Sequence, residues 1–159
     1  LTTQEVTFVN STSVLGNGNI TATGGSIPKT RGFCWNTAAN PTIEGAKTIE
    51  SGDFSTGAFS GPIAGLNPGV TYHLRAYATN AAGTDYGNEV VFTTPIAGDI
   101  DGINGVTLAD AVLALQVAVG MNPAGIRPNY ATSGADVNGD NKAGLAEVIY
   151  ILQILSKAR

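Results

Sequence analysis

The chain changes its hydrophobic pattern once, near Pro95. Before this residue, short segments rich in Val, Thr and aromatic side chains are separated by Gly, Pro and Asn clusters, as β-strands are separated by turns. The clearest alternation is in TYHLRAYA, where Tyr72, Leu74 and Ala76 share one phase. We expect strands at 5–10, 19–24, 30–36, 71–80 and 88–94. About seven strands at this spacing predict an all-β antiparallel sandwich.

After Pro95, two segments have the length and the Leu, Ala and Ile content of three-turn helices, residues 108–119 and 145–155. The change of pattern falls at the short stretch TPIAG. We therefore expect two domains, a β-sandwich over residues 1–95 and a small α-helical domain over residues 96–159. Because only a few residues separate them, we also expect the two domains to dock against each other.

The helical half contains an internal repeat. DIDGINGVTLADAVLALQ aligns without gaps with DVNGDNKAGLAEVIYILQ. Outside the segments expected to be helical, the identical pairs are Asp99 with Asp136, Gly102 with Gly139, and Asn104 with Asn141. A loop followed by a helix, present twice, indicates a duplicated supersecondary unit.

The second copy has oxygen donors at the spacing of a calcium loop. Calcium takes six to eight oxygens, and a twelve-residue loop supplies them from positions 1, 3, 5, 7, 9 and 12. Side chains fill positions 1, 3, 5 and 12, and a backbone carbonyl fills position 7: Asp136, Asn138, Asp140, Glu147 and Lys142. Gly144 at position 9 leaves that place to water. Asn141 stands at the sharp turn of position 6, where its tolerance of a left-handed backbone is useful.

The first copy follows the same scheme with one defect. Its donors are Asp99, Asp101, the Gly105 carbonyl, Thr107 directly or through water, and Asp110. Position 5 is Ile103, which has no oxygen to offer. We predict two Ca²⁺ sites, of which the loop at Asp99 binds more weakly.

All six acidic residues after Pro95 fall on these ligand positions. A simpler interpretation is that the Asp-Gly and Asn-Gly stretches are turns. Asp110 and Glu147 would then only stabilise the starts of helices. That interpretation does not explain why carboxylates are missing from the rest of the domain, and we favour calcium.

Tandem calcium loops, each followed by one helix, resemble a dockerin module of type I over residues 97–157. The resemblance implies calcium-dependent binding of a cohesin domain through a helix surface that the repeat duplicates. The contact positions map onto Leu108 with Leu145, Ala109 with Ala146, Leu115 with Leu152, and Gln116 with Gln153. The Ser-Thr pair common in the family is replaced by Leu-Ala, which implies a more apolar contact surface. For Leu115 and Leu152, a place in the core is the simpler interpretation.

The β half resembles a bacterial fibronectin type III domain. In GLNPGVTYHLRAYATNAAG, Leu66, Pro68 and Tyr72 match the pattern L-x-P-x-x-x-Y, followed by Ala78 and Asn80. The resemblance implies an immunoglobulin-like sandwich with the tyrosine packed at a corner and bonded to the main chain. Domains of this family serve as spacers, adhesion modules or platforms for partners.

Composition narrows the partners and the compartment. The 159 residues are 43% hydrophobic and 13% charged, which is enough to bury a core. A net charge of −4 and a pI near 4.7 argue against nucleic acid or an anionic membrane as partner. No apolar run reaches the roughly 18 residues of a membrane helix. The chain starts at Leu1 without a methionine or a signal peptide, and we expect a fragment of a secreted bacterial protein, extracellular or at the cell surface.

The sequence gives little support for catalysis. His73 falls on the outward phase of its strand, and Cys34 beside Trp35 is typical of a packed thiol. We therefore expect a non-enzymatic tether that binds cohesin, with the sandwich as spacer. The alternative is a calcium-rigidified stalk whose sandwich makes adhesive or polysaccharide contacts, for example through exposed Tyr77 and Tyr86.

Overall fold

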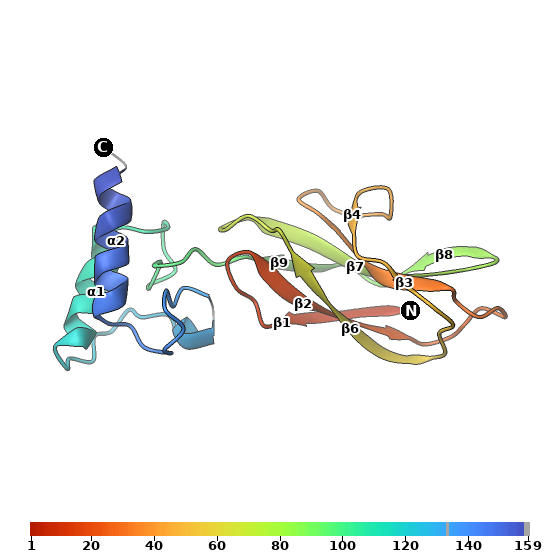
Figure 1. The fold of residues 1–159 in the computed structure, drawn as a ribbon, viewed down its shortest axis with the longest axis horizontal. Coiled ribbons are helices and arrows are strands. Elements are labelled where there is room, and N and C mark those ends of the chain that lie inside the picture. Colours follow the sequence, from red (N-terminus) through yellow and green to blue (C-terminus); the bar gives the residue numbers. More distant parts are fainter. Residues whose placement is uncertain (133, 158–159) are drawn as a thin grey trace. The chain divides into compact units, whose positions relative to one another are not determined.

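The computed structural model describes residues 1–132 and 134–157 (Figure 1). The chain forms two compact units, and the main division falls between Thr93 and Thr94. The second unit also includes the short segments Phe8–Thr12 and Asn67–Gly69. No helix in the described part of the chain has the length and apolar character needed to cross a membrane.

The first unit is a sandwich of two antiparallel sheets (Figure 1). The first sheet has the order β1 (Thr2–Thr7), β2 (Ser13–Ile20), β6 (Gly57–Ala64). In the second sheet, β3 (Thr30–Asn36) pairs with β7 (Thr71–Asn80) along its whole length. Four short strands flank this pair: β4 (Ala46–Lys47), β5 (Glu50–Ser51), β8 (Gly83–Tyr86) and β9 (Val90–Thr93). Fully buried Ile20, Phe33, Ile63 and Leu74 bring apolar side chains from both sheets into one core.

The strands at 30–36 and 71–80 have the predicted bounds. The strands predicted at 5–10 and 19–24 begin earlier, at Thr2 and Ser13, and β6 was not predicted. The pattern misled because glycines occupy inward positions of β2. A Cβ added to Gly16 would lie 3.0 Å from the Phe33 ring, and one added to Gly18 would lie 2.9 Å from the Phe59 ring. The aromatic rings of other strands therefore fill the space that apolar side chains of β2 would otherwise occupy.

The prediction of an exposed Tyr77 was wrong. Its side chain points away from the core of the sandwich by strand phase, yet the residue is only 2% exposed. Its hydroxyl donates a hydrogen bond to the Thr48 carbonyl at 2.7 Å, so the segment leading from β4 to β5 covers this face of β7. Tyr86 is half-buried. The two tyrosines therefore do not form an open aromatic platform.

The second unit contains the two helices that the pattern predicted, α1 (Leu108–Ala118) and α2 (Leu145–Lys157), and they lie side by side (Figure 1). A 3₁₀ helix, η1 (Tyr130–Thr132), lies in the segment between them. Thr107 caps α1 by accepting a hydrogen bond from the N–H of Ala109. Gly120, with φ of 83°, supplies the left-handed residue that follows the last turn of α1.

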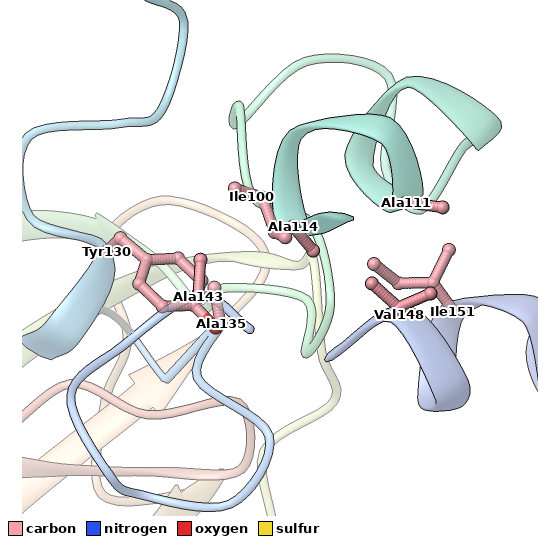
Figure 2. Packing of buried hydrophobic residues seen from close by; sticks show 8 residues of the cluster. All are labelled: Ile100, Ala111, Ala114, Tyr130, Ala135, Ala143, Val148 and Ile151. Atoms are coloured by element: carbon pink, nitrogen blue, oxygen red, sulfur yellow. The ribbon is translucent and has the colours of Figure 1, made fainter. Parts of the chain in front are cut away.

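One cluster of buried side chains holds the second unit together, and Figure 2 shows its members. Residues at equivalent positions of the repeat supply much of it, with Ala111 and Ala114 from α1 and Val148 and Ile151 from α2. The small side chains of α1 leave room for the larger ones of α2, so the helices pack closely. The other members come from the loops and the connecting segment: Ile100, Tyr130, Ala135 and Ala143.

Candidate calcium-binding loops and helix surface

The first loop brings three carboxylates together. Asp99, Asp101 and Asp110 each offer one oxygen, and these three oxygens lie within 4.8 Å of one another. Like charges this close repel one another. Asp99 and Asp110 are buried, which limits screening by water. A cation at this point would offset the repulsion.

Asp110 joins the loop to the start of α1. Its Oδ1 accepts hydrogen bonds from the N–H groups of Ile100 (2.7 Å) and Asp101 (3.1 Å). Its Oδ2 accepts from the N–H (2.8 Å) and the hydroxyl (2.9 Å) of Thr107. This reciprocal arrangement with Thr107 is a capping box. The same carboxylate therefore fixes the beginning of the loop, the end of the loop and the first turn of the helix.

The second loop repeats this arrangement with Glu147 in place of Asp110. Fully buried Glu147 accepts hydrogen bonds from the N–H of Val137 (Oε1, 3.3 Å) and from the N–H of Gly144 (Oε2, 2.7 Å). These donors occupy the same loop positions as Ile100 and Thr107. The duplication read from the sequence is therefore also a duplication of hydrogen-bonding geometry.

The asparagines at position 6 of both loops have the left-handed backbone that was expected at the sharp turn. Asn104 has φ of 62° and Asn141 has φ of 63°, both in the left-handed region. Asp136 then accepts bonds from the main chain at the turn, with Oδ1 to the N–H of Gly139 at 2.8 Å and Oδ2 to the N–H of Asn141 at 2.6 Å. The equivalent bond in the first loop runs from the N–H of Gly102 to Asp99 Oδ1 at 2.8 Å.

The middle positions of the two loops differ. In the second loop, Asp140 Oδ1 accepts from the N–H of Lys142 at 2.8 Å, and Asn138 Oδ1 accepts from the N–H of Asp140 at 3.2 Å. In the first loop, Ile103 stands where Asp140 stands in the second, and it is exposed. Its N–H donates to Asp101 Oδ1 at 2.7 Å. Ile103 thus keeps the main-chain geometry of the position and lacks the oxygen.

The seventh and ninth positions of the first loop are Gly105 and Thr107. Gly105 adopts a positive φ of 71°. The Thr107 hydroxyl donates to Asp110 and accepts from Ala109, so it serves the helix cap. The two routes expected for Thr107, direct contact or contact through water, both stay open, because one lone pair of the hydroxyl is not used by the cap. The oxygen donors of both loops, mainly carboxylates with a backbone carbonyl and, in the second loop, the amide of Asn138, fit a hard cation such as calcium.

Tyr130 lies against the second loop from the connecting segment. Burial is the main reason that the pKa of its hydroxyl lies well above its usual range. The carboxylates of Glu147, Asp136 and Asp140 add to this effect. Tyr130 therefore stays neutral beside the carboxylates of the second loop. Tyr130 was not predicted from the sequence, because it lies outside the repeat.

The residues expected to contact a partner lie on the outer faces of the helices. Leu115 is 50% exposed and Leu152 is 47% exposed, so their interpretation as core residues was wrong. The first-turn residues Leu108 and Leu145 are also exposed. Of the remaining predicted contact residues, Ala109 and Gln153 are exposed, and Ala146 and Gln116 are half-buried.

Two contact candidates were missed. Val112 and Ile149 are exposed and lie four residues after Leu108 and Leu145, on the same helix faces. The spacing i, i+4, i+7 on each helix was the signal that could have found them. We call the six residues of these two helix faces together the apolar stripe: Leu108, Val112, Leu115, Leu145, Ile149 and Leu152.

The two residues considered for catalysis are in structural settings. Cys34 is fully buried, and burial raises the pKa of its thiol to about 11. Its Sγ lies 3.5 Å from the carbonyl oxygens of Pro41 and Arg75, and its single S–H can donate to either. His73 Nδ1 lies 2.9 Å from Glu89 Oε1, and both side chains are partly buried. His73 is thus half-buried and paired.

No protein-family model and no curated protein sequence matches the chain. Among solved structures, the sensor domain of an anti-sigma factor from Pseudobacteroides cellulosolvens is similar, with a TM-score of 0.45 and 18% identity. The match covers 59% of this chain and 91% of that one. The sixth fibronectin type III domain of a human fibronectin type III domain containing protein is also similar, with a TM-score of 0.41 and 22% identity over 59% of this chain and 81% of that one.

The strand order of the two sheets identifies the fold of the first unit. Three strands, β1-β2-β6, face a second sheet whose main path is β4-β3-β7-β8. The first unit is a fibronectin III-like β-sandwich. The second unit has two helices, each preceded by a loop that ends in a buried carboxylate.

Proposed function

We propose that the second unit is a calcium-dependent protein-interaction module of the dockerin kind. It tethers a larger secreted protein to a cohesin-bearing scaffold or cell surface. The fibronectin III-like sandwich acts as a spacer and takes no part in catalysis.

The observation that carries the proposal is the apolar stripe. The same three positions of each helix, for example Leu115 and Leu152, expose large aliphatic side chains. The acidic residues of the helices, Asp110 and Glu147, are fully buried, and Lys157 stands at the far end of α2. Large aliphatic side chains that are exposed along a helix face without charged neighbours on it are typical of a site for a protein partner. The cohesin face that fits it is apolar and uncharged.

The loops explain why binding should depend on calcium. Each loop ends in the carboxylate that also fixes the first turn of its helix, Asp110 for α1 and Glu147 for α2. The stripe begins in those same first turns, at Leu108 and Leu145. Calcium that orders the loops would thereby hold the two halves of the stripe in position.

A binding titration against cohesin domains from the same organism tests the proposal. Leu115→Glu with Leu152→Glu should weaken binding at least about 30-fold, because each places a charge in the contact surface. Lys157→Glu, also on the exposed surface of α2, is the matched control and should bind as the wild type does. Excess EDTA should abolish binding by the wild type.

The same titration distinguishes cohesin binding from the alternative, a calcium-rigidified stalk. Binding that survives both Leu→Glu changes would contradict the stripe as the contact surface. If no cohesin binds while calcium still raises the melting temperature, the calcium-rigidified stalk is favoured. Glycan binding by the full chain that is insensitive to Leu115→Glu with Leu152→Glu would then assign the contacts to the sandwich.

A further inference from the structure

A cation already reaches into the first loop. Arg127, from the segment between the helices, places Nη2 2.9 Å from Asp99 Oδ2. The Arg127 side chain is only 16% exposed, and the N–H of Arg127 donates to the Ile100 carbonyl at 3.0 Å. A Cβ added to Gly102 would lie 3.3 Å from the guanidinium, so the loop backbone at Gly102 runs directly beside it. The guanidinium is thus built into the loop.

In the second loop, the residue of the connecting segment that lies near the carboxylates is not an arginine. There the connecting segment contributes Tyr130, a buried side chain whose phenol carries no charge at neutral pH. Lys142 belongs to the second loop, but its side chain is exposed, and water and salt screen its charge. A largely buried positive charge among the carboxylates is therefore a feature of the first loop, within the part of the chain that the structure describes.

We propose that Arg127 is a resident counter-cation of the first loop. It neutralises Asp99 when no metal is bound, which keeps the loop folded, and it opposes the charge of an incoming calcium ion. This inference rests on the proposed calcium binding and concerns its regulation. Arg127 makes the first loop a low-affinity site in addition to the oxygen missing at Ile103, so the first loop fills only after the second.

Removing the positive charge of Arg127 should destabilise the metal-free protein and strengthen calcium binding at the first loop. In Arg127→Gln, the three clustered carboxylates of the first loop lose their counter-charge. The melting temperature in EDTA should fall, and the calcium affinity of the first loop should rise about tenfold or more. A residue that only packed against the loop would lower both stability and affinity when replaced.

The experiment is a calcium titration of the full chain followed by NMR, because the amides of Gly102 and Gly139 report each loop separately. Lys157→Gln is the matched control: it removes the same charge from an exposed position and should change neither loop. Arg127→Lys keeps the charge but not the planar guanidinium, and its affinity should lie between wild type and Arg127→Gln.

The outcomes are distinct. A higher affinity at the first loop of Arg127→Gln, with the second loop unchanged, supports the inference. An unchanged or lower affinity at the first loop overturns it while calcium binding itself stands. If neither loop of the wild type binds calcium, the proposed function fails as well. Should Arg127→Gln unfold in EDTA, Arg127→Met, which is equally uncharged and keeps the aliphatic packing, decides: a gain in first-loop affinity supports the inference, and none overturns it.

Discussion

Asp110 is the residue whose replacement should disturb the second unit most, because one carboxylate satisfies four donors. In Asp110→Asn, one oxygen becomes an NH₂ group that faces donors in either orientation of the amide. Two bonds are therefore lost, either those from Ile100 and Asp101 or those from the N–H and hydroxyl of Thr107. Hydrogen bonds to a charged group contribute about 1.5–3 kcal/mol each, so losing two should cost about 3–6 kcal/mol, of which the weaker repulsion among the loop carboxylates recovers a part.

Far-UV circular dichroism of the full chain measures this loss, because the α-helices of the described residues lie in the second unit. The comparison is made in EDTA, so that metal binding does not contribute. For a small domain, a loss of about 3 kcal/mol lowers the melting temperature by roughly 12 °C or more. Asp101→Asn is the control, since Asp101 is half-buried and its Oδ1 accepts a hydrogen bond from the N–H of Ile103. A change of less than about 1 kcal/mol for Asp110→Asn would refute the reasoning.

Three further predictions address the loops and the sandwich. The loop at Asp99 should bind calcium more weakly than the loop at Asp136 in a calorimetric titration, and equal affinities would contradict this. Tyr130→Phe should lower the free energy of unfolding in urea by about 1 kcal/mol, because it removes a buried hydroxyl beside Glu147; no loss would show that the hydroxyl is not a structural partner. The Cys34 pKa is raised from 9.0 to about 11, so its contribution to stability is complete below pH 9 and is lost as the pH rises through 11. Unfolding in urea across this range should show a loss that Cys34→Ala lacks, and identical curves would contradict it.

The sequence predicted the elements whose side chains follow a simple period. The strands β3 and β7 and both helices were found because their buried residues recur at strand or helix spacing. The strand β2 was misplaced because Gly16 and Gly18 carry no side chain and the Phe33 and Phe59 rings fill their places. No local pattern reveals that a ring from a distant strand occupies the space above a glycine.

The candidate site was predicted where it lies inside the repeat. The left-handed backbone at Asn104 and Asn141 followed from residue type and position. Arg127 and Tyr130 were missed because they belong to the connecting segment, which has no repeat partner, and they reach the loops only through the fold.

Which helix residues are exposed could not be predicted from the sequence either. Leu115 and Leu152 suit a core or a contact surface equally by composition. Their exposure is decided by the smaller residues, such as Ala111 and Ala114, that occupy the interface between the helices.

The central claim is that calcium holds the second unit in its binding form. Differential scanning calorimetry of the full chain, with calcium and with excess EDTA, tests it most directly. We predict that chelation lowers the melting temperature of the transition that carries the helical signal and leaves that of the sandwich unchanged. An identical melting temperature of the helical transition in the two conditions would contradict the account.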